Sequence, residues 1–145
     1  MQSTTSGPGG GRYRCRVEWG DCDPAGIIFY PTYFRWMDAA SWAFVESAGY
    51  DAARMRAEHL AMPLVSAQCD FLVPALHGDR CEVRTQVERV GTKSFTVAHE
   101  IVREDGTVLA RGSETRVWGR FVAGPGSPMK GEAVPEAVRG MLAPK

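Results

Sequence analysis

The sequence predicts one α+β domain in which an antiparallel sheet of about five strands curls around a single long helix. Two observations lead to this fold class. One strand and one long helix are followed by four strands joined by short turns, an order typical of antiparallel sheets. The long helix is also apolar around most of its circumference. We therefore expect that helix to be wrapped by the sheet or covered by a partner subunit, and 145 residues suit one such domain.

The chain begins with a segment made mostly of Ser, Thr, Gly and Pro. Residues 1–11 are predicted to be a disordered tail, because they carry almost no apolar area to offset the entropy of ordering. Apolar and charged side chains then alternate with the period of a half-buried strand. The apolar members are Tyr13, Cys15, Val17 and Trp19, and the charged members are Arg12, Arg14, Arg16 and Glu18.

A change to helical spacing follows. The main apolar face consists of Phe29, Tyr33, Met37, Ala40, Phe44 and Ala48. Further large apolar side chains off this face are Phe34, Trp36, Trp42 and Val45. The spacing predicts a helix over residues 30–48 that Gly49 ends. A shorter helix is expected over residues 51–59, with Asp51 as its N-cap and Met55 facing the core.

Strands are predicted over residues 64–73, 81–88, 94–103 and 107–121. The turns between them are marked by Pro74 with residues 77–79, by Gly91, and by the pair Asp105-Gly106. Residues 122–145 are rich in Gly and Pro until a short helical candidate at 135–141. The predicted organisation is thus a domain over residues 12–121 between an N-terminal tail, 1–11, and a C-terminal tail with a short helix, 122–145.

Charge and composition exclude several classes of function. Lys plus Arg equals Asp plus Glu at 17 each, so no overall field attracts nucleic acid or a membrane surface. No apolar run approaches the length that crosses a membrane. The four cysteines form no C-x-x-C pair and no signal peptide precedes them, so free thiols in a cytoplasmic protein are expected. These cysteines are Cys15, Cys22, Cys69 and Cys81.

Two carboxylates, Asp21 and Asp23, stand in the glycine-containing loop between the first strand and the long helix. A metal site is disfavoured, because hard cations need about six oxygen ligands and no Asp or Asn follows at a calcium-loop spacing. Aspartate in such a loop often bonds to the backbone and fixes a turn, and we favour that role for Asp21. Asp23 precedes Pro24 and a helix N-terminus, so a nucleophile or general base and a turn-forming residue both stay open for it.

Other catalytic arrangements lack their residues. The sequence holds no G-x-S-x-G turn and no G-x-G-x-x-G after a strand. Cys22 is a poor thiolate candidate, because the carboxylates on both sides of it would raise its pKa. The histidines show no mutual metal-ligand spacing, and we expect each to be structural or solvated; they are His59, His77 and His99. No metal and no cofactor are predicted.

Residues 20–33 read Gly-Asp-Cys-Asp-Pro-Ala-Gly-Ile-Ile-Phe-Tyr-Pro-Thr-Tyr, and residues 35–41 continue Arg-Trp-Met-Asp-Ala-Ala-Ser. This segment resembles the active-site segment of hot-dog fold acyl-CoA thioesterases, most of all the 4-hydroxybenzoyl-CoA thioesterase branch. Residues 74–79 and the Lys-Ser-Phe motif at 93–95 fit the same family, so the resemblance covers residues 13–121. It implies a hot-dog fold in which two subunits pair their sheets edge to edge and the acyl site lies between them.

The resemblance also implies roles for particular residues. Asp23 would be the nucleophile or general base toward the thioester carbonyl, and the backbone N–H of Tyr30 would hold the oxyanion. Asp38 matches a position that faces the acyl pocket across the dimer, where it would receive a hydroxyl on an aromatic acyl group; a surface or dimer-contact carboxylate is the alternative. Lys93 and Ser94 are expected at the CoA, with a solvated turn as the alternative for Lys93.

One feature departs from the branch. Gly91-Thr92 stands where the hydroxybenzoyl type has a basic cluster before its Lys-Ser-Phe motif, which leaves Arg89 and Lys93 as the nearby cations. Aromatic side chains of the helix are candidates either for an aromatic-acyl pocket or for plain core. They are Tyr33, Phe34, Trp36 and Trp42.

The function implied is hydrolysis of a CoA thioester to the free acid and CoA, by a homodimer or a tetramer of hot-dog dimers. The acyl group would be aromatic, such as 4-hydroxybenzoyl, or short-chain aliphatic. A non-catalytic acyl-CoA or small-ligand binding protein on the same scaffold is the alternative. A hot-dog dehydratase would need a histidine beside an acid, and no histidine occurs in the strand-to-helix loop.

Overall fold

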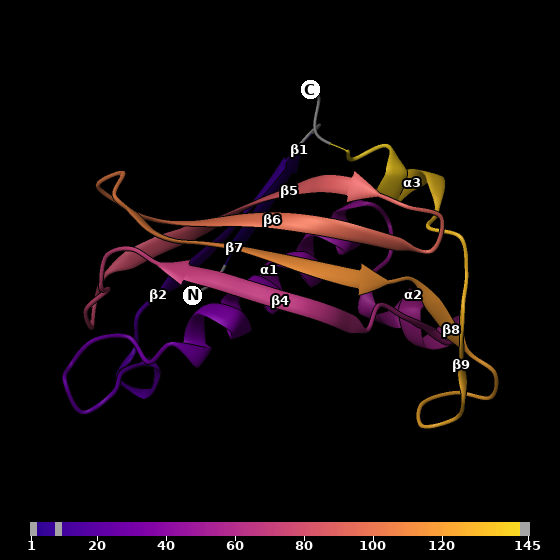
Figure 1. Cartoon of the computed structure of the whole chain (residues 1–145), viewed down its shortest axis with the longest axis horizontal. Coiled ribbons are helices and arrows are strands. Elements are labelled where there is room, and N and C mark those ends of the chain that lie inside the picture. Colours follow the sequence, from indigo (N-terminus) through magenta and orange to yellow (C-terminus); the bar gives the residue numbers. More distant parts are fainter. Residues whose placement is uncertain (1–2, 8–9, 143–145) are drawn as a thin grey trace.

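The computed structural model describes residues 3–7 and 10–142, and it contains a six-stranded antiparallel sheet with helix α1 lying against one face (Figure 1). The strand order is β1-β2-β5-β6-β7-β4. The strands are β1 (Ser3–Gly7), β2 (Gly10–Arg16), β4 (Leu64–Phe71), β5 (Arg80–Val90), β6 (Ser94–Arg103) and β7 (Val108–Val117). The α+β class with a curled antiparallel sheet around one long helix is confirmed.

Helix α1 (Pro31–Ser47) is the central element of the core. Proline suits its first position, since the first N–H groups of a helix have no intrahelical partner. The buried side chains are Thr32, Tyr33, Trp36, Met37, Ala40, Ser41, Phe44 and Val45. Trp36 and Val45 lie off the main apolar face that the sequence predicts, yet both are only 1% exposed. The rest of the domain therefore covers much of the helix circumference, as expected.

Smaller elements cover the C-terminal end of α1. Helix α2 (Ala52–Ala57) is capped as predicted, because the N–H of Arg54 donates to Asp51 Oδ1 at 2.8 Å. A second sheet consists of β3 (Leu60–Ala61), β8 (Gly119–Phe121) and β9 (Met129–Gly131), followed by helix α3 (Glu136–Arg139). Val134 and Val138 are buried in one apolar cluster with Val45. Residues 122–142 therefore pack onto the domain, although the sequence predicted a tail.

Two strand predictions need correction. The disordered tail expected over residues 1–11 is wrong for residues 3–7 and 10–11, which are paired strands; residues 1–2 and 8–9 lie outside the described residues. Without β1, strand β2 would leave a row of unpaired N–H and C=O groups, and backbone pairing to this edge needs no apolar side chains. The single strand predicted over residues 107–121 is divided between β7 and β8, which belong to different sheets.

The core consists of two apolar clusters that meet around α1. One includes Met37, Ala40, Val83, Ile101 and Ala110, and the other includes Val45, Phe95, Val97, Trp118 and Val138. Between these two groups, the inward positions along α1 and the strands are polar. The buried polar residues at these inward positions include Ser41, Thr85, His99, Glu114 and Arg116. Among the helices of the described residues, none has the length and apolarity needed to span a membrane.

Candidate active site

The loop between β2 and α1 folds into a small hairpin around a tight turn. The N–H of Gly26 donates to the carbonyl of Asp23 at 2.9 Å, and the N–H of Asp23 donates to the carbonyl of Ile27 at 2.9 Å. A type I turn prefers Asp at its first position, Pro at its second and Gly at its fourth, and residues 23–26 match this preference. Gly26 has φ +81°, a conformation that glycine adopts without steric cost. The local sequence thus positions Asp23 at the start of the turn.

The carboxylate of Asp23 is fixed by one of its two oxygens. Oδ1 accepts a hydrogen bond from the N–H of Ala25 at 2.8 Å, which is the side-chain-to-backbone bond typical of aspartate in turns. Within the described part of the chain, Oδ2 accepts no hydrogen bond, and the residue is half-buried. Asp23 therefore has a defined orientation and one oxygen available for chemistry.

Asp21 has a structural role, as predicted. Its Oδ2 accepts from the N–H of Glu18 at 2.8 Å, and its Oδ1 forms a short ion pair with Arg35 of α1. Asp21 is buried, at 7% exposure, although it stands only two residues from Asp23. Its carboxylate is occupied by these partners, so it ties the loop to the helix.

Cys22 lies between the two carboxylates. Partial desolvation and then the negative charges of Asp21 and Asp23 raise the pKa of its thiol above the ordinary value. The thiolate is therefore scarce at neutral pH, as the sequence predicted, and nucleophilic attack by Cys22 is disfavoured.

Tyr30 is the last residue before α1 and presents an open backbone donor. The N–H groups on either side are engaged: that of Phe29 donates to Asp21 O at 2.7 Å, and that of Thr32 donates to Phe29 O at 2.9 Å. Pro31 has no N–H. Within residues 3–7 and 10–142, the N–H of Tyr30 donates no hydrogen bond. This donor stands at the positive end of a 17-residue helix, where an anion is stabilised.

Aromatic rings gather beside this helix start. Phe71 of β4 lies with its ring centroid 6.2 Å from that of Tyr30, 5.4 Å from that of Tyr33 and 6.4 Å from that of Phe34. Phe71 is 49% exposed and Tyr30 is 58% exposed in the single chain. Phe34 is partly exposed and stays a candidate for an aromatic pocket, whereas Tyr33, at 3% exposure, and Trp36, at 1%, are buried core.

Trp42 lies away from this cluster. It lines a separate hollow beside α2, together with Met55, Leu60 and Phe121. Trp42 is therefore also removed from the candidate site, by its position rather than by burial.

Lys93 and Ser94 lie at the opposite end of the sheet from Asp23. They occupy the turn between β5 and β6 and the start of β6, near α3, whereas the loop that precedes α1 is at the other end (Figure 1). The 11 residues of β5 separate the two ends, a span of roughly 35 Å. Lys93 is exposed. One chain alone does not bring Lys93 and Ser94 to Asp23.

Asp38 stands on α1, roughly two turns after Tyr30. Its side chain is 55% exposed, and its Oδ1 accepts a hydrogen bond from Arg116 Nη2 at 2.7 Å. Arg116 lies on β7 and is only 3% exposed. Asp38 is thus the exposed member of an ion pair whose other member is buried.

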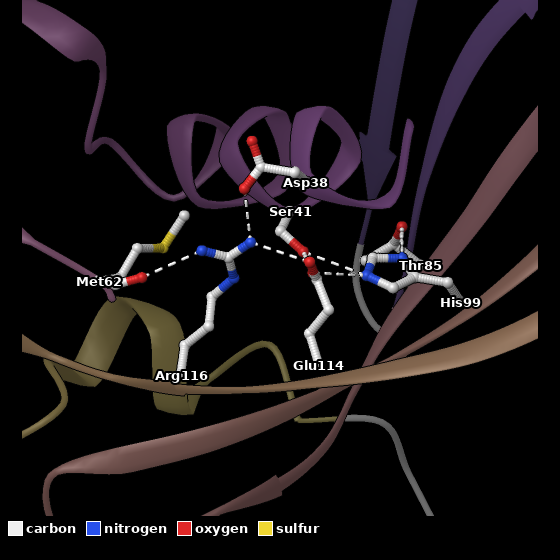
Figure 2. A network of polar contacts seen from close by, with 7 residues as sticks. All are labelled: Asp38, Ser41, Met62, Thr85, His99, Glu114 and Arg116. Carbon is white, nitrogen blue, oxygen red and sulfur yellow. Dashed lines mark hydrogen bonds and ion pairs between the residues drawn. The ribbon is translucent and has the colours of Figure 1, made fainter. Parts of the chain in front are cut away.

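Behind this ion pair lies a buried polar network that sequence reasoning missed (Figure 2). Arg116 Nη2 donates to Glu114 Oε2 at 2.9 Å. Glu114 Oε1 accepts from Ser41 Oγ and lies 2.9 Å from His99 Nε2. On the other side of the imidazole, His99 Nδ1 lies 2.9 Å from Thr85 Oγ1. Four elements, α1, β5, β6 and β7, each contribute to the network.

The environment of Glu114 keeps its carboxylate ionised. Burial by itself would raise the pKa of Glu114, but the hydrogen bonds from His99 and Ser41 and the charge of Arg116 outweigh it, so the pKa lies below its ordinary value. Because the ionised carboxylate only accepts, Nε2 of His99 carries the hydrogen of that contact.

Serine, histidine and glutamate are the residue types of a hydrolase triad, but this geometry is different. In a triad, the serine and the carboxylate bind opposite nitrogens of the imidazole. Here Ser41 Oγ, at 3.1 Å, and Glu114 both contact Nε2, and Ser41 is fully buried. The network therefore presents no accessible nucleophile.

The dehydratase alternative finds no support within one chain. Among the described residues, His99 contacts Ser41, Thr85 and Glu114 rather than Asp23. The ring of His77 stacks on that of Trp19 with centroids 4.1 Å apart. His59 follows α2.

The signal that would have revealed the network was present in the alternation of the strands. Thr85 continues the inward series of Cys81, Val83 and Val87, and His99 continues that of Phe95, Val97 and Ile101. Polar residues at inward positions of neighbouring strands predict a buried network, because buried polar groups need partners. Glu114 and Arg116 gave a weaker signal, since their strand carries few apolar residues.

Comparisons with known proteins agree with this geometry. Residues 17–140 match the model of the thioesterase-like superfamily. The chain is 34% identical over 110 residues to a 4-hydroxybenzoyl-CoA thioesterase from Pseudomonas sp. (strain CBS-3), covering 71% of this chain and 78% of that protein. It is 29% identical over 135 residues to a 1,4-dihydroxy-2-naphthoyl-CoA hydrolase from Synechococcus sp. (strain WH7803), covering 88% and 84%.

A solved structure supports the same assignment. A gentisyl-coenzyme A thioesterase superposes with a TM-score of 0.78 at 35% sequence identity, covering 88% of this chain and 98% of that one. The predicted resemblance to hot-dog acyl-CoA thioesterases is thus confirmed at the level of sequence and of fold. The chain belongs to the thioesterase-like superfamily.

Proposed function

We propose that this protein hydrolyses the thioester bond of an acyl-CoA to the free acid and CoA, with Asp23 acting on the thioester carbonyl and the N–H of Tyr30 binding the oxyanion. The observation that carries this proposal is the pair of unengaged groups on one loop. Within the described residues, Asp23 Oδ2 accepts no hydrogen bond and Tyr30 N–H donates none, although their immediate neighbours are engaged.

The chemistry needs little more than these two groups. As a general base, Asp23 takes a proton from the water that attacks the carbonyl carbon; as a nucleophile, it attacks that carbon itself and water hydrolyses the resulting anhydride. In both routes the carbonyl oxygen gains negative charge at the Tyr30 N–H, and one such donor is typically worth about 10² to 10³ in rate. A thiol has a pKa near 8.5, so the CoA thiolate leaves with little need for a general acid.

An aromatic acyl group bearing a hydroxyl fits the site best. Tyr30, Phe34 and Phe71 offer aromatic surface beside the helix start, and the buried ring of Tyr33 packs against Phe71. The names of the three relatives described above all contain a hydroxylated aromatic acyl group. Asp38 supplies a carboxylate that accepts a hydrogen bond from such a hydroxyl. Short-chain aliphatic acyl groups would use the same apolar surface without that bond.

We further propose that the working unit is a homodimer, or a tetramer built from such dimers, that pairs its sheets through β4. Strand β4 is an edge of the six-stranded sheet and carries exposed apolar side chains, including Leu64, Val65 and Phe71. An exposed apolar edge strand is a template for pairing with another chain. An antiparallel pairing of two sheets would carry Lys93 and Ser94 of one subunit toward the Asp23 loop of the other, where they would bind the CoA.

A cytoplasmic location is part of the same proposal. Cys15, Cys22, Cys69 and Cys81 are free thiols, as is usual in a reducing compartment. Burial raises the pKa of Cys69 to about 11 and that of Cys81 to about 12, so these two thiols resist oxidation at neutral pH.

The test is turnover of a panel of acyl-CoA substrates by the purified protein. The panel pairs 4-hydroxybenzoyl-CoA with benzoyl-CoA and adds acetyl-CoA and hexanoyl-CoA, with release of CoA followed by chromatography. We expect the fastest turnover for the hydroxylated aromatic substrate. Tight binding of every substrate without release of CoA would instead favour the acyl-CoA binding protein, and absence of both would refute the proposal.

A further inference from the structure

We propose that Arg116 is a positioning residue that holds the carboxylate of Asp38 in place for the acyl group, supported from behind by Glu114, His99 and Ser41. This inference rests on the proposed function, because it assigns Asp38 to the acyl pocket. It goes beyond that function in naming a buried arginine, remote from Asp23, as a determinant of acyl selectivity.

The guanidinium of Arg116 is immobilised by acceptors on three sides. Nη1 donates to the carbonyl of Met62 at 3.0 Å, and Nη2 donates both to Glu114 at 2.9 Å and to Asp38 at 2.7 Å. Among the described residues, Nε has no acceptor although it is buried. A planar guanidinium bound in this way has one orientation, so the oxygen of Asp38 that meets it is fixed as well.

Glu114 is itself held, so it cannot follow a moving arginine. Its side chain is 2% exposed, and its Oε1 is bound by Ser41 and His99, whose imidazole in turn meets Thr85 (Figure 2). The chain of contacts starts in the middle of the core and ends at Asp38, whose side chain is 55% exposed. Asp38 is the one member of this network that solvent or a ligand reaches, within the part of the chain that the structure describes.

The charges of the network define the kind of group that Asp38 recognises. Arg116 carries one positive charge, and Glu114 and Asp38 carry one negative charge each, so the three together are negative. Asp38 Oδ1 faces Arg116, and Oδ2 accepts no hydrogen bond within residues 3–7 and 10–142. The exposed end of the network therefore favours a neutral or cationic hydrogen-bond donor, such as a phenolic hydroxyl, and disfavours an anionic substituent.

Burying an arginine between two carboxylates costs desolvation free energy that apolar side chains in the same place would not. Replacing a buried ion pair by apolar residues of similar volume is often neutral or stabilising. The neighbouring inward residues across the sheet are apolar: Phe95 is the partner of Arg116, and Val97 is the partner of Glu114. A network maintained among apolar neighbours points to a task other than stability, and the exposed carboxylate at its end supplies one.

The measurement is the preference for 4-hydroxybenzoyl-CoA over benzoyl-CoA, which differ by one hydroxyl. We take it as the ratio of kcat/KM values and, in the Asp23→Asn background, as the ratio of Kd values from calorimetry. The variants are Arg116→Lys, Asp38→Asn and the double variant. Lysine keeps the positive charge but loses the planar fork, so it holds Asp38 poorly.

In the single variants Arg116→Lys and Asp38→Asn, we expect the preference for 4-hydroxybenzoyl-CoA over benzoyl-CoA to fall about tenfold. Because Arg116 acts through Asp38, adding Arg116→Lys to Asp38→Asn should cause no further fall. Ser41→Ala, a smaller change behind Glu114, should lower the preference in the same direction and serves if Arg116→Lys does not fold.

Arg120→Lys is the matched control. Arg120 also pairs with a carboxylate, Glu132, at 2.7 Å and donates to a backbone carbonyl, that of Glu58, but among the described residues it forms no hydrogen bond or ion pair with α1. Its substitution should leave the preference unchanged. The inference would be overturned if Arg116→Lys left the preference unchanged, or if Arg120→Lys lowered it equally. It would also be overturned if adding Arg116→Lys to Asp38→Asn lowered the preference by the same factor again. The proposed function fails on a different result, namely that the wild type releases no CoA. In that case the ratio of Kd values for 4-hydroxybenzoyl-CoA and benzoyl-CoA still tests the inference.

Discussion

At the scale of single residues, the three aspartates near the start of α1 differ in their partners and therefore in what they do. Asp21 is occupied by Arg35 and the N–H of Glu18, which makes it part of the scaffold. Among the residues that the structure describes, Asp23 has a turn bond to Ala25 through Oδ1, and its Oδ2 accepts no hydrogen bond. Asp38 is held by Arg116 at the surface. Spacing in the sequence did not separate these three roles, whereas the contacts do.

The buried carboxylate of Glu114 should make the stability of the protein depend on pH in the acid range. Its pKa is lowered on folding, so its contribution is present above the unfolded pKa, near 4.3, and is lost as pH falls through the lower folded value. We expect the free energy of unfolding to fall below about pH 4, and Glu114→Gln to flatten this part of the profile.

At neutral pH, Glu114→Gln should cost about 3 kcal/mol, because it weakens a buried charged network. Urea unfolding at a series of pH values measures both effects. Asp105→Asn is the comparison: the pKa of Asp105 is also low, through Arg103 and Thr107, but this pair is exposed and 1 M salt should screen it. If Glu114→Gln and the wild type, both measured at high salt, showed the same dependence of unfolding free energy on pH, this account of Glu114 would be contradicted.

Part of the site could be predicted at this scale. Asp23, Gly26 and Tyr30 follow one another in a short segment whose turn chemistry is local, so the sequence indicated their arrangement. Arg116 meets Asp38, and Glu114 meets Ser41, only because β7 passes under α1, more than 70 residues later in the chain. Such contacts depend on strand register, and alternation within one strand does not give them.

At the scale of elements, the close packing of α1 on β7 depends on Gly112. A Cβ atom at this position would lie 2.5 Å from Met37 Sδ and 2.7 Å from the carbonyl oxygen of Gln68. Met37 belongs to α1 and Gln68 to the neighbouring strand β4. The glycine thus lets the helix and the edge strand approach β7 together.

Gly112→Ala should therefore destabilise the fold by about 1 to 3 kcal/mol, as overpacking of a core does. The backbone oxygen of Gln68 has little freedom to move aside, so the strain cannot be relieved by a rotamer change alone. Thermal and urea unfolding measure the loss. Gly20→Ala is the control, because among the described residues no heavy atom outside its two chain neighbours lies within 4 Å of the added Cβ, and its stability should be unchanged. Equal free energies of unfolding for Gly112→Ala and Gly20→Ala would show that the close contact at Gly112 does not constrain stability.

The elements themselves were largely predictable, and the exceptions have one cause. Periodicity identified α1, α2 and the strands β4 to β7, because each carries an apolar face of its own. These faces are largely buried except in β4, whose residues are mostly exposed in the single chain. Strand β1 and the small sheet of β3, β8 and β9 were missed or misplaced, since they are held mainly by backbone pairing. Backbone hydrogen bonds leave little trace in the pattern of apolar side chains.

At the scale of the whole molecule, the six-stranded sheet has two edge strands, β1 and β4, that differ in composition. Strand β1 reads Ser-Thr-Thr-Ser-Gly, whereas β4 carries the exposed apolar side chains Leu64, Val65 and Phe71. The ring of Phe71 lies 6.2 Å from that of Tyr30, so the β4 edge runs beside the loop of Asp23. A second chain paired there would complete the acyl site and bring its own Lys93 and Ser94.

Val65→Lys should consequently separate the subunits. Val65 is 64% exposed on β4, and charged side chains on an edge strand oppose pairing. We expect sedimentation to show a shift from dimer to monomer and turnover to fall with it. Val122→Lys is the matched control, since Val122 is 67% exposed but lies after β8, and it should keep the wild-type assembly. A monomeric wild type with full turnover would remove the need for a partner subunit.

The most direct test of the account is the turnover number of Asp23→Asn with 4-hydroxybenzoyl-CoA. The amide keeps the shape of the side chain and its bond to Ala25 but cannot act as a base or a carboxylate nucleophile, so a loss of at least about 100-fold in kcat is predicted, with binding retained. Asp51→Asn, at a helix cap where Asn serves equally well, should keep the wild-type rate. A fully active Asp23→Asn enzyme would contradict the assignment of Asp23 as the catalytic residue.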